Sequence, residues 1–228
     1  AMFLSQRAED HVYWVERSGK AHKNLSLNAA PVDVAEYLRR RLFGSDTSVI
    51  MTNATLATQV LRNESSASAG LNYFAKRVGA EAAVKLQVGS PFDYERQMNL
   101  FVVNKIPEPR DAGYREALMK WIEHFVRKTH GKEFVLFTNF KLMLEAGEQM
   151  ERFFEELGVQ CFVQGTGTPR SLMLEKFKED VDSVLFGTDS FWQGVDVPGE
   201  ALSNVIITRL PFAVPDHPLI EARIEAIE

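Results

Sequence analysis

Residues 183–199 read Ser-Val-Leu-Phe-Gly-Thr-Asp-Ser-Phe-Trp-Gln-Gly-Val-Asp-Val-Pro-Gly, a short apolar run followed by a polar loop. The run predicts a buried strand, because it is compact, mostly apolar and bounded by turn residues. The Asp196 carboxylate in the loop can accept a hydrogen bond from a ribose hydroxyl. The hydroxyl groups of Thr188 and Ser190 can donate hydrogen bonds to phosphate oxygens. Two glycines let the backbone approach a ligand closely, Gly187 and Gly194. The stretch indicates a strand and loop suited to a nucleotide or a nucleic-acid strand.

Apolar runs of strand length recur along the chain. They predict strands at His11–Val15, Thr47–Thr52, Val84–Val88, Asn99–Val103, Glu133–Thr138, Val159–Val163, Ser183–Phe186 and Asn204–Thr208. From the third quarter onward these runs alternate with amphipathic helical segments, at 112–130, at 140–157 and after a Thr168-Pro169 cap. Pro31 and Pro218 are further predicted helix starts. Strands that alternate with helices through short loops predict an α/β fold with a mostly parallel sheet flanked by helices.

Four polar loops follow predicted strands. In a parallel α/β sheet, ligands bind at the loops after the carboxyl ends of the strands. One such loop alone is also explained as a capped turn, because Ser, Thr, Asn and Gly favour turns for local reasons. Four together favour a shared binding edge. The candidate residues are Thr52, Thr55, Thr138, Asn139, Gln164, Gly165, Arg170, Ser190, Trp192, Gln193, Gly194 and Asp196.

Two details of these loops bear on the ligand. The turn Gly165–Arg170 lies between a strand and a helix, but the third glycine of a dinucleotide fingerprint is replaced by Arg170. A helix that begins at Pro169 still offers free backbone N–H groups to one backbone phosphate. Phe191 and Trp192 are adjacent, so we expect one ring to point inward and the other to lie near the ligand.

Composition limits the class of protein. The chain has 228 residues, 45% of them hydrophobic, and a net charge of −5, so contact with nucleic acid requires a local basic patch. The single cysteine, Cys161, excludes an internal disulfide, and the five histidines lack the paired spacing of a metal site. The sequence has no apolar run long enough to span a membrane, so we expect a cytoplasmic protein with no membrane partner and no bound metal of its own.

Several of these strings resemble motifs of the DinG/XPD family of superfamily-2 DNA helicases. Ser190–Asp196 resembles motif V, Val135–Thr138 resembles motif IV, and Thr52–Leu56 resembles motif III, with Asn53 where the family usually has Ser. The resemblance spans roughly residues 11 to 228. Further similar strings are Gln164-Gly165, Gly89–Asp93 and Arg209–Phe212.

The resemblance implies two RecA-like domains of the P-loop-NTPase type, which clamp ATP between them and step along single-stranded DNA. Residues 1–56 would then close the first domain and residues 57–228 would form most of the second, with the polar stretch 62–70 near the boundary. The implied cofactor is ATP with Mg²⁺ in the complete protein, and the implied partners are single-stranded DNA and the first helicase domain in cis.

By the same resemblance, each candidate residue has an expected role. The residues expected to face the ATP cleft are Gln193, Gly194 and Asp196. Those expected to contact the DNA backbone are Thr138, Asn139, Gln164, Gly165, Arg170, Ser190 and Trp192. Thr52 and Thr55 are expected to couple the two domains, and Asn53 between them departs from the family's usual hydroxyl.

The sequence lacks three motifs that phosphoryl transfer requires in this family. It contains no G-x-x-x-x-G-K-[ST] loop, no Asp-Glu-x-His segment and no Gln-x-x-Gly-Arg-x-x-Arg stretch with an arginine finger. We therefore expect no ATPase activity from these residues alone. Two alternatives remain open: a non-catalytic nucleic-acid-binding module with the same loops, and an unrelated α/β nucleotide enzyme that uses the Gly165–Arg170 turn.

Overall fold

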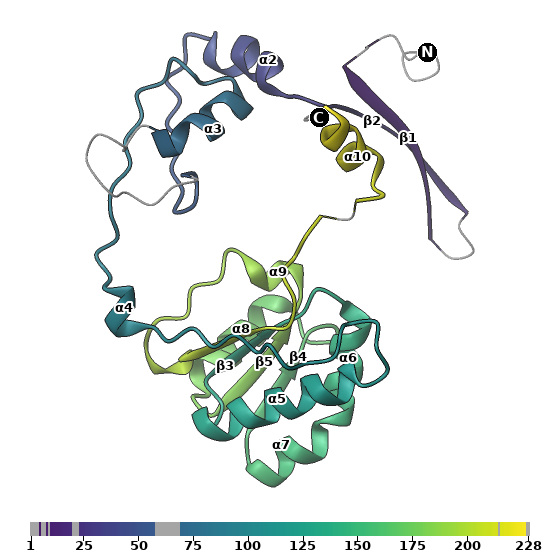
Figure 1. The fold of residues 1–228 in the computed structure, drawn as a ribbon, viewed down its shortest axis with the longest axis vertical. Helices are drawn as coiled ribbons and strands as arrows, with labels where there is room; N and C mark the ends of the chain where they lie inside the picture. The colour runs from purple at the N-terminus through teal and green to yellow at the C-terminus, as the bar shows by residue number, and fades with distance from the viewer. Residues whose placement is uncertain are drawn as a thin grey trace. The chain divides into compact units, whose positions relative to one another are not determined.

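The computed structural model describes residues 5, 8, 10–19, 23–57, 69–213 and 215–226. The chain divides into two compact units (Figure 1). The first consists of Ala1–Asn99 together with Ala213–Glu228, and the second consists of Leu100–Phe212. The stretch 62–68 of the expected linker lies outside the described residues. The domain boundary at residue 56 stays a prediction.

The second unit is built on a parallel sheet of four strands in the order β4-β5-β3-β6. The strands are β3 (Glu133–Leu136), β4 (Gln160–Val163), β5 (Ser183–Gly187) and β6 (Asn204–Ile207). In register, Glu133 of β3 lies opposite Val184 of β5 and Asn204 of β6. The expected mostly parallel α/β sheet is confirmed.

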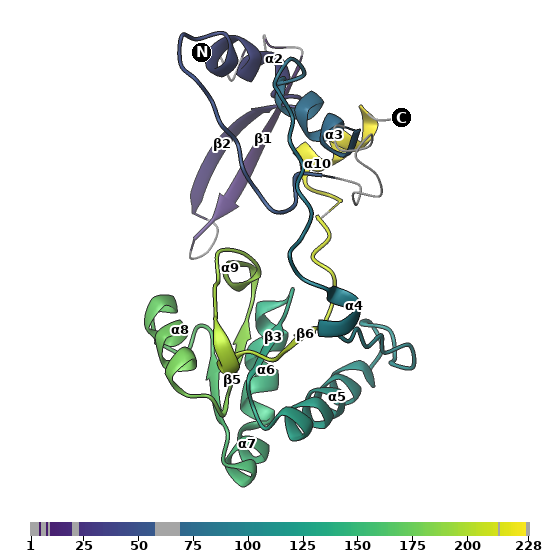
Figure 2. The same cartoon turned by 90° about the vertical axis from the view of Figure 1, so that its left-hand side faces the viewer.

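Helices cover both faces of this sheet, as Figure 2 shows. One face packs against α5 (Tyr114–Thr129), α6 (Phe140–Gln149) and α7 (Glu151–Leu157), and the other packs against α8 (Arg170–Glu179) and the short α9 (Asp189–Trp192). The separation follows from the alternation of side chains along each strand. In β3, for example, Val135 belongs to the first core, whereas Phe134 and Leu136 belong to the second.

A buried carboxyl group lies at the amino end of the sheet. Glu133 is 0% exposed, and its Oε2 accepts hydrogen bonds from Asn204 Nδ2 at 2.7 Å and Thr129 Oγ1 at 3.2 Å. Its Oε1 is buried without a hydrogen-bond partner. Because burial disfavours the charged form, the pKa of Glu133 is raised from 4.5 to about 7.

The first unit contains an antiparallel hairpin of β1 (His11–Ser18) and β2 (Asn24–Pro31). Helix α10 (Pro218–Glu225) packs against this hairpin: the rings of Trp14 and His217 are 5.4 Å apart, and Arg223 Nε donates to Val32 O at 3.2 Å. The remaining elements of the unit are α2 (Ala35–Leu38), the π-helical turn Arg39–Phe43, α3 (Ala69–Val78) and α4 (Tyr94–Gln97).

The structure corrects three of the predicted strands. Residues 47–52, 84–88 and 99–103 form no strand, although 84–88 alternates apolar and polar residues and the other two contain short apolar runs. The side chains of Val84, Leu86 and Val88 are 101%, 81% and 77% exposed. An alternating pattern identifies residues that fit a pleated surface, but a strand also requires a neighbour to pair its backbone. Strand β2 was not predicted, although Leu25 and Leu27 alternate with polar residues in its first half.

The helix boundaries also differ in places. Pro31 ends β2, and α2 begins only at Ala35. The segment 140–157 breaks into two helices at Met150, which caps α6 and precedes α7. Pro169, instead of Thr168, is the N-cap of α8, and no side chain caps that helix. Gly158 ends α7 at φ +71°, as its position in the sequence predicts.

Candidate nucleic-acid interface

The predicted polar loops of the second unit leave the sheet at one edge. Because all four strands are parallel, their carboxyl ends meet along the same edge. We call this edge the carboxyl rim. Thr138 and Asn139 follow β3, Gln164 and Gly165 follow β4, Ser190 follows β5 and Arg209 follows β6. Residues from four separate parts of the sequence therefore share one edge.

Gln164 ties the β4 loop to the β5 loop. Its Oε1 accepts from Thr188 N at 2.8 Å and from Thr188 Oγ1 at 3.0 Å, and its Nε2 donates to Ser190 Oγ at 3.2 Å. Both ends of the side-chain amide are thus used within the protein. The arrangement makes Gln164 a positioning residue, which presents the Ser190 hydroxyl at the rim.

Arg170 holds the same loop from the start of α8. Its Nε donates to Ser190 O at 3.0 Å, its Nη2 lies 3.5 Å from Gly194 O, and its guanidinium carbon is 5.1 Å from the centre of the Phe191 ring. The guanidinium therefore shapes the loop between Ser190 and Gly194. The side chain is nevertheless exposed, so its remaining N–H groups stay accessible at the rim.

The two adjacent aromatic residues are buried to different degrees. Phe191 is the inward ring, only 2% exposed, and packs in the core beneath α8. Trp192 is half-buried, and its Nε1 donates to Phe137 O at 3.3 Å. Because this hydrogen bond fixes the indole against β3, Trp192 supports the rim and can offer a ligand only its remaining exposed surface.

Two rim glycines adopt left-handed backbone conformations for different reasons. Gly165 has φ +90°, and a Cβ there would lie 2.5 Å from Cζ of Phe140. Gly194 has φ +66° with open space around it, so only its backbone conformation favours glycine. On either side of it, Gln193 and Asp196 are exposed and form no hydrogen bond with the rest of the described chain.

A small cationic pocket opens beside Thr138. Its volume is about 150 Å³, and its lining is Pro109, Tyr114, Arg115, Thr138, Asn139, Lys141, Leu142, Thr208 and Arg209. Asn139 Oδ1 accepts from Leu142 N at 2.9 Å and so caps α6. Thr208 Oγ1 donates to Leu136 O at 3.0 Å. These hydrogen bonds fix the walls of the pocket.

The charge of this pocket is positive. Arg115 and Lys141 share one carboxylate, that of Glu145, at 2.6 Å and 3.8 Å. Arg209 has no ion pair within the described part of the chain. Three cations and one carboxylate leave the pocket suited to an anion such as a phosphate.

Most of the residues of this pocket were not predicted from the sequence. Arg209 lies two residues after the end of β6, so its position after a strand could have signalled a rim residue. Lys141 is also close in sequence to a predicted contact, Asn139. Tyr114 and Arg115 come from the start of α5, and no local pattern connects them to β3. Burial raises the pKa of Tyr114, whose hydroxyl donates to Thr208 O at 3.2 Å.

Thr52 and Thr55 belong to the first unit. The side chain of Asn53 accepts from Thr55 N at 2.9 Å and from Thr55 Oγ1 at 3.0 Å. This is an Asx turn, a local role that a shorter serine side chain would fill less fully. All three residues are exposed.

The parallel sheet, the two helical layers and the polar carboxyl rim are those of a RecA-like α/β domain. Residues 122–228, just under half of the chain, match the family described as helicase C-terminal domain.

The relatives identify the kind of helicase. The chain is 34% identical over 213 residues to the ATP-dependent DNA helicase YoaA of Escherichia coli, covering 93% of this chain and 31% of that protein. It is 31% identical over 222 residues to the 3'-5' exonuclease DinG of Bacillus subtilis, covering 95% and 23%. It is 34% identical over 218 residues to the ATP-dependent helicase DinG of Mycobacterium tuberculosis, covering 95% and 31%. The chain is thus a DinG-like helicase C-terminal region.

This chain spans about a quarter to a third of the length of these relatives. Within the described ranges, no helix is long and apolar enough to cross a membrane. In the same ranges, no three His, Cys, Asp or Glu side chains gather in a way that would hold a metal ion.

Proposed function

We propose that this chain is the DNA-tracking part of an ATP-dependent DNA helicase, and that its carboxyl rim binds the backbone of single-stranded DNA. The observation that supports this most directly is the cationic pocket beside Thr138 and Asn139, which combines three cations with hydroxyl and amide groups. Phosphate contacts of this kind position a strand without reading its bases. The protein's net charge of −5 makes such a local patch necessary for DNA binding.

The rim extends from this pocket toward Ser190. We place a second phosphate contact there, at the hydroxyl that Gln164 holds in position. The positive φ at Gly165 allows the backbone to turn tightly beside it, and exposed N–H groups of Arg170 lie at the same loop. Two contacts along one edge would hold consecutive stretches of a strand, as translocation requires.

The loop Gln193–Asp196 is the proposed wall of the ATP cleft. The side chains of Gln193 and Asp196 are exposed and form no hydrogen bond with other described residues, as expected for groups that meet a nucleotide and a facing domain. In this proposal the first helicase domain, in cis, supplies the phosphate-binding loop and the Mg²⁺ ligands. Thr52 and Thr55 would couple the two domains. The residues described here would bind and orient the nucleotide, and would not by themselves catalyse its hydrolysis.

DNA binding by the rim is tested with a fluorescein-labelled oligo-dT strand and fluorescence anisotropy on the 228-residue chain. The double variant Lys141→Ala/Arg209→Ala removes two phosphate partners, so we expect weaker binding and a salt dependence whose slope falls by about 1.4. The control is Lys178→Ala, an exposed cation in the last turn of α8. Equal losses in both proteins, or no loss in either, would refute a role for the pocket.

ATP turnover separates the helicase from a non-catalytic DNA-binding module. We expect the 228-residue chain to show no turnover with or without single-stranded DNA. In the full-length protein, Asp196→Ala should reduce DNA-stimulated turnover while oligo-dT affinity stays within about twofold. Unchanged turnover would remove Asp196 from the ATP site, and DNA binding without any turnover by the full-length protein would favour the module.

A further inference from the structure

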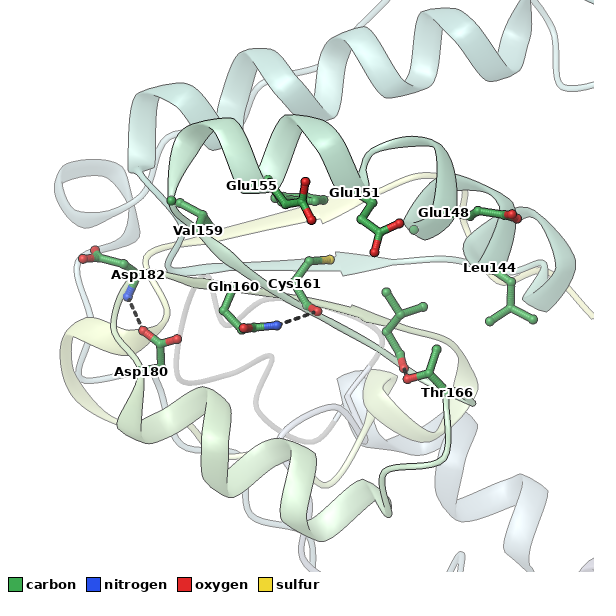
Figure 3. Close-up of a pocket in the computed structure, with 14 residues that line it drawn as sticks. Leu144, Glu148, Glu151, Glu155, Val159, Gln160, Cys161, Thr166, Asp180 and Asp182 are labelled. Carbon is green, nitrogen blue, oxygen red and sulfur yellow. Dashed lines mark hydrogen bonds between the residues drawn. The ribbon is translucent and has the colours of Figure 1, made fainter.

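The edge strand β4 borders a groove that the proposed DNA and ATP sites do not use. The groove has a volume of about 670 Å³. One side is formed by α6 and α7, and the other by the turn between α8 and β5, with β4 along the floor (Figure 3). Within the described part of the chain, no strand pairs with β4 on this side.

The backbone N–H and C=O groups of every second residue in β4 point toward the groove. Gln164 N donates to Phe186 O of β5 at 3.0 Å, so the alternation of a strand points the N–H and C=O groups of Cys161 and Val163 away from β5. A sheet edge with such groups is a template for another strand. The groove therefore exposes a short row of backbone donors and acceptors.

Side chains already occupy the two outward carbonyl groups. Cys161 O accepts from Gln160 Nε2 at 3.4 Å, and Val163 O accepts from Thr166 Oγ1 at 2.8 Å (Figure 3). The first of these hydrogen bonds is long, and both donors are exposed groups that can rotate into water. An incoming strand could displace them at little cost, because each donor would regain a water partner.

The walls of the groove are strongly acidic. Five carboxylates line it, and none forms an ion pair with a Lys or Arg in the described residues. They are Glu148, Glu151, Glu155, Asp180 and Asp182. Figure 3 shows Glu151 and Glu155 on the α7 side of β4, and Asp180 and Asp182 on the other side. The lining contains no cation, so this surface repels nucleic acid and attracts a positively charged partner.

We propose that the β4 edge binds an extended, lysine- or arginine-containing segment of a partner protein, which adds to the sheet as a fifth strand. Backbone hydrogen bonds to Cys161 and Val163 would supply affinity, and the flanking carboxylates would select a basic sequence. A strand's side chains alternate between faces, so basic residues at every second position would all face Glu148, Glu151 and Glu155. The site lies at the edge of the sheet and is separate from the residues proposed to bind DNA.

The probe is a fluorescein-labelled nine-residue peptide that alternates lysine and threonine, measured by fluorescence anisotropy against the 228-residue chain. We expect saturable binding, and at least about tenfold weaker binding when glutamate replaces lysine. Two further peptides carry N-methyl groups on either the lysine or the threonine amides. At least one of them should lose binding, because methylation removes N–H groups that face β4. Equal binding by all three lysine peptides would show non-specific charge attraction and overturn the proposal.

Variants of the chain test the same two features. Val163→Pro removes one of the outward N–H groups that an added strand would use, so it should abolish peptide binding. The β4 strand itself should remain intact, because an edge strand tolerates proline on its open side. Glu151→Gln/Glu155→Gln should weaken binding at least about tenfold without altering the strand. The matched control is Glu175→Gln/Glu179→Gln, with exposed carboxylates on α8 outside the groove. An equal effect of the two double variants would overturn the proposal.

A second copy of this chain is the competing occupant. Its acidic edge would meet another acidic edge, which disfavours pairing. If sedimentation shows a dimer that Val163→Pro converts to a monomer, the edge binds a second copy and the proposed basic partner is wrong.

Discussion

The buried carboxyl group of Glu133 makes the stability of the second unit depend on pH in a predictable direction. The pKa is raised in the folded protein, so the folded state holds the proton more tightly than the unfolded state. The stabilisation that the protonated Glu133 carboxyl group contributes is fully present below about pH 4.5, and it is lost as the pH rises through about 7. Between pH 5 and pH 8 the loss is about 2.5 kcal/mol of the free energy of unfolding.

The perturbation is Glu133→Gln, which keeps the acceptor for Asn204 and Thr129 but cannot ionise. The difference in free energy of unfolding, variant minus parent, should therefore rise by about 2.5 kcal/mol between pH 5 and pH 8. The difference in free energy of unfolding at pH 5 also includes the cost of burying the amide N–H groups of the new Gln side chain. That cost does not depend on pH, so it cancels in the change between pH 5 and pH 8. This change isolates the ionisation of the carboxyl group.

The assay is urea unfolding followed by tryptophan fluorescence. In a Trp14→Phe background, the remaining indoles are Trp121 and Trp192, and both belong to the same compact unit as Glu133. The control is Glu175→Gln, an exposed carboxyl group on α8. Parallel pH profiles for the parent and Glu133→Gln, within about 0.5 kcal/mol, would refute the desolvated environment of this side chain.

Three further predictions concern the rim. Gly165→Ala should cost more than about 1 kcal/mol of the free energy of unfolding, and more than Gly158→Ala, because both glycines have positive φ but only the first lacks space for a methyl group; equal costs in urea unfolding would show that the ring beside it yields. Asn139→Ala should cost about 1 kcal/mol through loss of the α6 cap, and recovery with Asp at this position would confirm the capping role. Gln164→Ala should raise the hydrogen-exchange rate of the Thr188 amide without unfolding the sheet, and an unchanged rate would show that the loop holds itself.

The sheet of the second unit could be predicted because its strands have local signals. The run 183–186 has three apolar residues after Ser183 and lies buried in β5, and the amphipathic segment 112–130 became α5 with Leu118, Ile122 and Val126 buried. The expected parallel sheet then placed the loops after β3, β4 and β5 along one edge, because the carboxyl ends of parallel strands meet there. The fourth predicted loop, 52–56, follows no strand and belongs to the first unit.

The remaining features depend on contacts distant in sequence. Segment 84–88 has the alternation of a strand, but local sequence does not say whether a neighbour pairs with it. The cationic pocket joins α5 to the ends of β3 and β6, across 94 residues from Tyr114 to Thr208. Arg170 was expected to face a phosphate, and its hydrogen bonds to the backbone of the β5 loop could not be predicted from its position at a helix start. The candidate roles of the rim residues in DNA and ATP binding remain predictions.

The side-chain amide of Gln164 acts as a crosslink between the loops after β4 and β5, which Arg170 also joins from the start of α8. A force on the β5 loop, such as closure of a facing domain on a nucleotide, would pass through three hydrogen bonds to the loop beyond β4. The two loops would shift together, and the grip on one stretch of DNA would change in step with the nucleotide. In the proposed function, the uncharged side chain of Gln164 would thus couple the ATP cleft to the DNA-binding loops.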